Sequence, residues 1–335
     1  MQERIIKFDG NVGFSTSASA VGKCEHRGPI GECFDIHDET DRFGKSTWEK
    51  AESEMQRLSL NIALSKQKLT EGDIDALFAG DLLNQCVGSS YGLLDFDIPY
   101  FGLYGACSTA VEGIILAATL CSGGHARRCA VVTSSHNSAA ERQYRTPIEY
   151  GGQRSPTAQW TVTGAGAFII EKSRDIRISE AMAGIVVDGG ITDASNMGAA
   201  MAPAAISTLT RYFKATKKTP EDFDLILTGD LGFEGGSIFC ELMKVEGYDV
   251  RKNYNDCGML IYDREAQDMH SGGSGCGCSA VVLASYILPK LARGELSDIL
   301  LLGTGAMMSP SSVLQGESIP SVAHLVRIKS AKKEG

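Results

Sequence analysis

The chain has 335 residues, of which 43% are hydrophobic and 22% are charged, a balance typical of a globular protein with a substantial core. The net charge of −9 argues against a broad nucleic-acid surface, because such surfaces are basic. No apolar run could cross a bilayer, and the first residues lack a signal-peptide pattern, so we expect a protein kept inside the cell.

The first elements are predicted from capping and periodicity. Ser46 with Glu49 reads as a capping box, and apolar residues follow at helical spacing as far as Ile62. The segment DIDALFAGDL at 73–82 then predicts a buried strand that ends in a turn at Asp81.

The stretch YFGLYGACSTAVEGIILAATLCSGG at 100–124 places Cys107 between a short apolar run and a small-residue apolar segment. This pattern predicts a strand-to-helix turn, and a cysteine at a helix N-terminus is a candidate nucleophile because the helix end stabilises a thiolate. The alternative is an inert small residue buried in a tight turn. The remaining cysteines contain no CxxC pair and no His/Cys finger, which predicts neither a disulfide framework nor a zinc site.

Further candidates follow along the first half. The strand RCAVVTSSHN ends near His136, a weaker candidate for a polar group in a site. Arg145 and Arg154 lie near the ends of the next segment and could form carboxylate forks, although a solvated arginine is the commoner case. The segment 160–172 predicts a strand whose glycines allow another backbone to approach, and 198–218 predicts an amphipathic helix.

The second half repeats the first. DFDLILTGDL at 222–231 matches the strand at 73–82 in order and spacing, 149 residues further on. GACSTAVEGIILAA followed by RCAVVTSS is matched by GCGCSAVVLASYIL followed by DILLLGTGA. We therefore expect an α/β fold made of two copies, 1–180 and 181–335, with a mostly parallel sheet. Ligands of such sheets bind beyond the carboxyl ends of the strands.

Three polar residues of the second copy are candidates for a site. Asp230 lies in the repeated turn, Asp256 in NDCGML, and His270 in HSGGSGCGCSA. Each could instead be structural, because turn aspartates commonly cap their own backbone and a histidine can bond to an adjacent turn.

The duplicated halves and the motifs GACST, TGAGAF and HSGGSGCGCSA resemble the thiolase superfamily, which includes the thiolases and the ketoacyl synthases. The resemblance covers nearly the whole chain. It implies a layered αβαβα fold and a dimer built through the first-half region that carries Cys107. In the condensing members, a cysteine at this position carries an acyl group, and a His with an Asn or a second His completes the site.

The resemblance also shows what this chain lacks. It places a histidine where the chain has Asp230 or Gly229, and an asparagine near Gly273, where there is none. A thiolase-type histidine would fall at or near His270. Because loss of one oxyanion donor typically costs about 10²–10³ in rate, condensation is not expected. Simple acyl transfer from Cys107 with His270 as the base stays open as an alternative.

The stretches YGACSTAVEG, DCGMLIYDRE and HSGGSGCGCSAVVLASY resemble, more narrowly, a sporulation family understood as binding proteins. This resemblance implies uptake of dipicolinic acid (pyridine-2,6-dicarboxylic acid), free or as its calcium chelate, into the developing spore. It implies that the protein acts together with the stage V sporulation A proteins. It also implies a location on the cytoplasmic side of the forespore inner membrane and no cofactor. The expected ligand-binding residues are Cys107, Asp230, Asp256, His270 and His136.

The expected way to hold a dianion combines helix ends and carboxylates. The helix N-termini after Cys107 and after the glycine-rich turn at 272–278 offer N–H groups to the ligand's carboxylates. Asp230 and Asp256 would then bind the calcium of the chelate through oxygen ligands.

Overall fold

A computed structural model describes residues 5–8, 12–144, 154–173 and 175–331. The strands are β1 (Ile6–Lys7), β2 (Val12–Gly22), β3 (Ile36–Asp38), β4 (Ala76–Gly80), β5 (Tyr100–Gly102), β6 (Arg128–Ser135), β7 (Trp160–Thr161), β8 (Gly164–Lys172), β9 (Ile176–Met182), β10 (Leu225–Thr228), β11 (Tyr254–Asp256), β12 (Gly273–Ser274), β13 (Asp298–Ala306) and β14 (Ser321–Ser330). The helices are α1 (Lys23–His26), α2 (Trp48–Lys66), α3 (Val87–Gly92), α4 (Thr109–Ser122), α5 (Asn137–Tyr144), α6 (Met197–Thr216), α7 (Gly232–Val245), α8 (Cys257–Leu260), α9 (Cys276–Val282), α10 (Leu288–Arg293) and α11 (Pro310–Leu314).

The duplication is visible in the strand order. Within the described residues a 12-stranded sheet runs β11-β10-β13-β14-β9-β2-β8-β6-β4-β5, with β1 beside β9 and β3 beside β2. Read outward from the centre, β2-β8-β6-β4-β5 and β9-β14-β13-β10-β11 have the same sequence of antiparallel and parallel pairings. The two copies share a centre where β2 meets β9 through the pair Gly13 and Arg177. The expected division at residue 180 falls inside β9.

The expectation of a mostly parallel sheet is wrong. In each copy the two outer pairings are parallel, while β8 and β14 run antiparallel to both of their neighbours. Antiparallel neighbours need no crossover helix, so β13 can lead into its neighbour β14 without one. The alternation of helices and strands in the sequence does not reveal these reversals.

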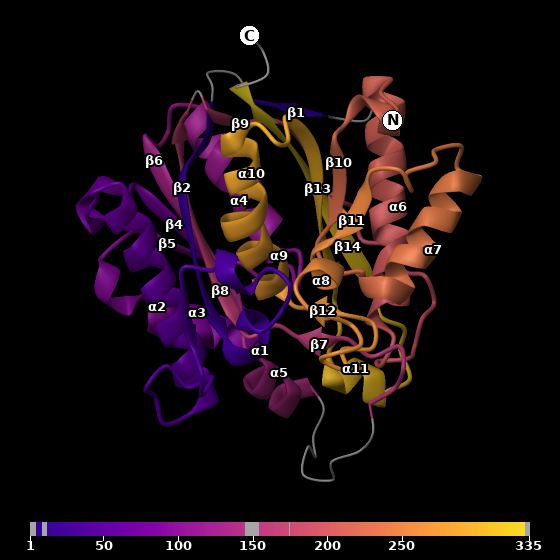
Figure 1. Ribbon diagram of the computed structural model, residues 1–335, viewed down its shortest axis with the longest axis horizontal. Helices are drawn as coiled ribbons and strands as arrows, with labels where there is room; N and C mark the ends of the chain where they lie inside the picture. The colour runs from indigo at the N-terminus through magenta and orange to yellow at the C-terminus, as the bar shows by residue number, and fades with distance from the viewer. Residues whose placement is uncertain (1–4, 9–11, 145–153, 174, 332–335) are drawn as a thin grey trace.

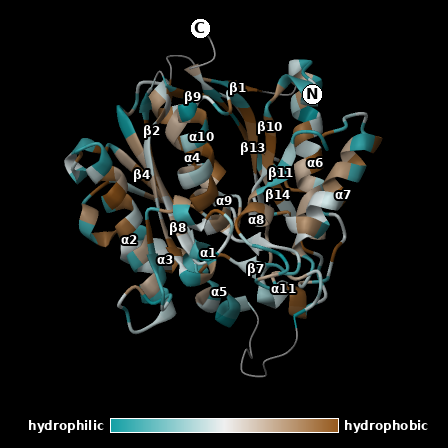
Figure 2. Ribbon diagram, viewed as in Figure 1, coloured by the Kyte–Doolittle hydropathy of each residue, from teal (hydrophilic) through white to brown (hydrophobic). Residues whose placement is uncertain are grey.

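The layers follow the order helix, sheet, helix, sheet, helix (Figure 1). Helices α4 and α9 lie between the two halves of the sheet and share one hydrophobic core with strands of both. A second core joins α6 and α7 to the outer face of the second half, and a third joins α2 to the outer face of the first. In Figure 2 strands β10 and β13 of the second half are drawn in the brown of hydrophobic residues. The layered α/β arrangement expected from the sequence is confirmed.

The repeat extends to the caps before the strands. Thr70 and Asp73 form a capping box ahead of β4, and Thr219 and Asp222 form the same box ahead of β10. Both strands are buried, as the repeated segments predict. The predicted capping box of α2 is wrong by one residue, because the Thr47 side chain accepts the hydrogen bond from the Lys50 N–H.

Two details bear on the site. A Cβ on Gly166 would lie 2.7 Å from the Ala280 backbone carbon, so α9 packs directly on β8 as the glycine pattern predicts. The short parallel pair β7 and β12 brings Thr161 of the first copy beside Ser274 of the second. Across the described residues, no helix is both long and apolar enough to cross a membrane.

Candidate functional site

Cys107 lies on the strand-to-helix turn that the sequence predicts. The turn follows β5 and leads into α4, and Ala106 has a φ of +49°, a left-handed conformation that is uncommon outside glycine. Such backbone strain is often found at functional sites. The Cys107 side chain is buried, with 9% exposure, and borders a cavity.

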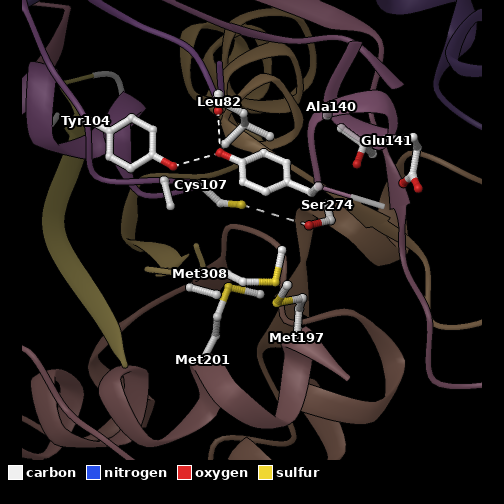
Figure 3. A pocket seen from close by; sticks show the side chains of 13 residues that line it. Leu82, Tyr104, Cys107, Ala140, Glu141, Met197, Met201, Ser274 and Met308 are labelled. Atoms are coloured by element: carbon white, nitrogen blue, oxygen red, sulfur yellow. Dashed lines mark hydrogen bonds between the residues drawn. The ribbon is translucent and has the colours of Figure 1, made fainter. Parts of the chain in front are cut away.

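The cavity lies between the two copies and has about 550 Å³ of empty space including its mouth. Its interior is narrow, because the space that the centre of a water molecule can reach is about 70 Å³, below the roughly 300–1,000 Å³ of typical drug-sized sites. The cavity therefore suits only a small ligand. Figure 3 shows the lining, which consists of Leu82, Tyr104, Ala106, Cys107, Ala140, Glu141, Tyr144, Thr161, Met197, Met201, Ser274, Ala306 and Met308. Leu82 follows β4 and Ala306 ends β13, so the cavity lies beyond the carboxyl ends of strands, as expected.

Asp230 lies directly behind this lining, and both oxygens of its carboxylate accept hydrogen bonds from the protein. One oxygen accepts hydrogen bonds from the Ser274 hydroxyl at 3.0 Å and the Gly275 N–H at 2.9 Å. The other accepts a bond from the Thr304 hydroxyl at 2.8 Å. Burial raises the pKa of Asp230, although these hydrogen bonds act to lower it. Asp230 therefore holds the turn before α9 in place, and it takes the N–H group of Gly275 that was expected to face a ligand.

The thiol of Cys107 is held in its protonated form. Burial, and then the nearby Asp230 carboxylate, raise the pKa of Cys107 well above its ordinary value. Its sulfur lies 3.9 Å from the Ser274 hydroxyl oxygen, a weak contact that offsets little of this effect. Since the thiolate is the nucleophile, this environment works against covalent chemistry.

The N–H groups at the start of α4 are also used locally. The Ser108 N–H donates to the Gly105 carbonyl, and the Thr109 N–H donates to the Ala106 carbonyl. On α9 the Gly277 N–H donates to the Ser135 hydroxyl. The expectation that the two helix ends present these groups to an anion is therefore wrong for Ser108, Thr109, Gly275 and Gly277.

The structure does not bring Asp256 to the cavity. Its carboxylate accepts hydrogen bonds from the Thr228 hydroxyl and from the N–H groups of Leu231, Gly232 and Met259. It thus caps α8 and the approach to α7, which is the structural alternative considered for this residue. Burial outweighs these bonds and raises its pKa to about 7.

The two expected histidines also lie elsewhere. His270 borders a separate shallow cavity with Arg154, and its ring nitrogens face the Ser155 carbonyl at 2.7 Å and the Asp268 carboxylate at 3.1 Å. His136 is buried with one ring nitrogen 2.8 Å from the Asp41 carbonyl, and burial lowers its pKa. Neither lines the cavity beside Cys107. Arg145 lies outside the described residues.

Sequence reasoning missed several lining residues. Ser274 follows directly after Gly273, where an asparagine was sought, so attention to the next position would have found it. Tyr104 and Tyr144 line one side of the cavity. Their hydroxyl oxygens are 2.9 Å apart, and the Tyr144 hydroxyl donates a hydrogen bond to the Leu82 carbonyl. Met197 and Met201 lie on α6, Met308 comes from a distant segment, and no local signal marks them as lining residues.

Among the residues that the structure describes, no group of three or more His, Cys, Asp or Glu side chains could hold a metal ion. The hydrogen bonds to Asp230 and Asp256 are consistent with this finding, because they already use oxygens that a cation would need.

Comparison with known proteins places the chain in a family. The model of the family "Stage V sporulation protein AD (SpoVAD)" matches residues 2–329. Stage V sporulation protein AD of Bacillus subtilis is 44% identical over 325 residues, which cover 97% of this chain and 96% of that protein.

The fold is also similar to solved structures of low sequence identity. A 3-oxoacyl-[acyl-carrier-protein] synthase III from Aquifex aeolicus is 10% identical with a TM-score of 0.57, covering 95% of this chain and 99% of that one. A variant of OleA from Xanthomonas campestris is 13% identical with a TM-score of 0.61, covering 97% and 100%. These likenesses confirm the thiolase-like fold, and the sequence match decides the family. The chain belongs to the stage V sporulation protein AD family.

Proposed function

We propose that the chain binds dipicolinic acid as its calcium chelate in the cavity beside Cys107, and passes it on chemically unchanged for uptake into the developing spore. Membership of the family supports the role in sporulation. The observation that carries the proposal is the cavity itself, which is narrow, lies at the strand ends between the two copies, and has a buried thiol with a raised pKa where the resemblance places a nucleophile.

The charges of the lining favour the chelate over the free acid. Glu141 is the one charged side chain among the described lining residues, and it is acidic. Free dipicolinate carries two carboxylates at neutral pH, and burying unpaired charges is costly. In the calcium chelate these charges are compensated before binding, because Ca²⁺ takes oxygen ligands from the dipicolinate itself. The neutral chelate therefore suits this cavity better than the dianion.

The proposal replaces the expected role of the two aspartates. Both carboxylates are buried and already accept hydrogen bonds from the protein, so in this proposal the calcium is held by its own ligand and not by Asp230 or Asp256. Calcium dependence of binding then reflects charge neutralisation, and Asp256→Asn should leave it unchanged.

Isothermal titration with dipicolinate tests the proposal. We expect binding with calcium present and binding at least roughly tenfold weaker with a calcium chelator. The Asp256→Asn variant, checked for folding by circular dichroism, should show the same ratio. Equal affinity with and without calcium would contradict the chelate, and no binding in either condition would contradict the ligand.

Acyl transfer from Cys107 is the second candidate, favoured by the strained turn at Ala106 and by the fold. Incubation with short and long acyl-coenzyme A donors, followed by intact-mass measurement, separates the two. A mass increase that disappears in Cys107→Ala would establish an acyl-enzyme. We expect no such adduct, because the thiol is buried beside a carboxylate.

The proposed location is the cytoplasmic side of the forespore inner membrane, reached through the other stage V sporulation A proteins. Co-sedimentation with membrane vesicles that contain or lack those proteins checks this. We expect the chain to sediment only with vesicles that contain them. Equal binding to plain lipid vesicles would contradict attachment through protein partners.

A further inference from the structure

Three methionines line one side of the cavity. Met197 and Met201 are one turn apart on α6, so they share a face of that helix, and Met308 comes from the segment between β13 and α11. Figure 3 shows the three side chains together, across from Cys107 and Ser274. The whole chain has 10 methionines, and three of them line this one small cavity.

This methionine wall, defined as Met197, Met201 and Met308, is partly open to the cavity. Met201 is fully buried in the second core, while Met197 and Met308 are only partly buried and pack against that core from the cavity side. The second core, which includes Leu302 of β13 and buried residues of α6, supports these side chains. The thioethers form an apolar surface with polarisable sulfur atoms.

The opposite side of the cavity is polar and neutral. The Cys107 thiol, the Ser274 and Thr161 hydroxyls, and the paired hydroxyls of Tyr104 and Tyr144 lie among its lining residues. The narrow interior gives little length for an extended aliphatic chain. A flat molecule with one apolar face and polar groups at its edge fits such a slot.

We propose that the methionine wall receives the face of an aromatic ring, so that the site selects planar aromatic dicarboxylates over saturated ones. This inference rests on the proposed function and names the contacts that determine its specificity. Sulfur atoms make favourable contacts with aromatic rings, and the flexible methionine side chain adapts to a flat surface.

Methyl NMR with ¹³C-methionine gives the direct test. Each methionine methyl gives one signal, and a methyl group above a ring face shifts upfield. On addition of calcium and dipicolinate we expect upfield shifts of the Met197, Met201 and Met308 signals, assigned by Met→Leu substitution at each position. The signal of Met182, which is buried in β9 outside the cavity lining, should not move.

Affinity gives the second test. The Met201→Leu, Met308→Leu double variant keeps the apolar volume and removes two sulfur atoms, so we expect dipicolinate to bind roughly threefold to tenfold more weakly. Met182→Leu is the matched control and should bind as the parent does. cis-Piperidine-2,6-dicarboxylate keeps both carboxylates but lacks a flat ring, and its nitrogen is a basic amine. With calcium in excess, so that both ligands are compared as chelates, we expect it to bind at least roughly tenfold more weakly than dipicolinate.

The outcomes separate this inference from the proposed function. If the parent protein binds dipicolinate but these methyl signals do not shift upfield, or the saturated ligand binds as tightly, the aromatic selection is wrong and the proposed function stands. If the parent protein binds neither compound, the proposed function fails and this inference fails with it.

Discussion

The Cys107 thiol and the Asp230 carboxylate form the most informative pair of residues in the molecule. The resemblance to condensing enzymes predicts a histidine near Asp230, whereas burial, and then the Asp230 carboxylate, raise the pKa of Cys107. Burial and this carboxylate together disfavour the thiolate, which is the reactive form of a cysteine. The pair therefore supports the proposed non-covalent binding in the cavity.

Alkylation rates test this account of Cys107. With iodoacetamide at pH 8, we expect Cys33, which is exposed, to react well before Cys107, because only the thiolate reacts and Cys107 stays protonated. Peptide mass spectrometry over time gives both rates in one sample. Asp230→Asn should accelerate labelling of Cys107 relative to Cys33. Faster labelling of Cys107 than of Cys33 in the parent protein would contradict the proposed protonation state.

Removal of the thiol group tests its part in binding. Cys107→Ala deletes one small side chain from the lining and leaves α4 in place, so we expect the fold to survive and dipicolinate affinity to fall roughly threefold. Circular dichroism and titration check the two statements. Unchanged affinity would place the ligand elsewhere.

At the scale of elements, a buried carboxyl joins segments of both copies. Glu25 of α1 accepts hydrogen bonds from the Tyr262 hydroxyl, which follows α8, and from the Thr163 N–H between β7 and β8. Its second oxygen has no hydrogen-bond partner among the described residues. Burial raises the pKa of Glu25 from 4.5 to about 7. The buried contact of Glu25 with Tyr262 and Thr163 is therefore most stable when the Glu25 carboxyl is protonated.

The pH dependence of stability follows from this shift. A carboxyl whose pKa is higher in the folded state binds protons more tightly there, so its contribution is present below about pH 4.5 and is lost as the pH rises to about 7. Glu25→Gln mimics the protonated form. Its free energy of unfolding, relative to that of the parent protein, should be higher at pH 8 than at pH 4 by up to about 3 kcal/mol. Urea unfolding at both pH values measures this. If the free energies of unfolding of the two proteins differ by the same amount at both pH values, the raised pKa of Glu25 is contradicted.

The junction of the two half-sheets depends on a glycine. A Cβ at Gly13 would lie 1.9 Å from the Ile176 carbonyl oxygen, so β2 and β9 could not approach as they do. We expect Gly13→Ala to lower the free energy of unfolding by about 2–4 kcal/mol. Gly72→Ala is the control, because its Cβ would come no closer than 3.8 Å to another atom. Equal unfolding midpoints in urea would show that the junction tolerates a methyl group.

Much of the element order could be predicted from the sequence, because repeated turns and glycines leave local signals. The match between 73–82 and 222–231 predicts β4 and β10, and the small residues after Cys107 predict α4. Strand direction could not be predicted, since it depends on connections and not on composition. The lining of the cavity was also largely hidden, because Met201 and Met308 meet Ser274 only through packing between distant segments.

At the scale of the whole molecule, β5 ends the sheet with an exposed edge. Its three residues are exposed, and Phe101 has 51% exposure. Unpaired apolar edges tend to pair with another chain. We therefore expect the dimer proposed from the first-half region, formed by β5 of two copies. Light scattering should give twice the monomer mass, and Phe101→Lys should reduce it to 35.7 kDa. A parent mass of 35.7 kDa across a wide concentration range would contradict the dimer.

The central claim is that calcium dipicolinate occupies the cavity between the two copies without bonding covalently to the protein. A crystal structure of the protein with calcium and dipicolinate tests it most directly. The account predicts a flat ring between the Cys107 and Ser274 side and the methionine wall, with calcium held by the ligand and the Cys107 sulfur unmodified. Density for the ligand at another place, or a covalent bond to Cys107, would contradict it.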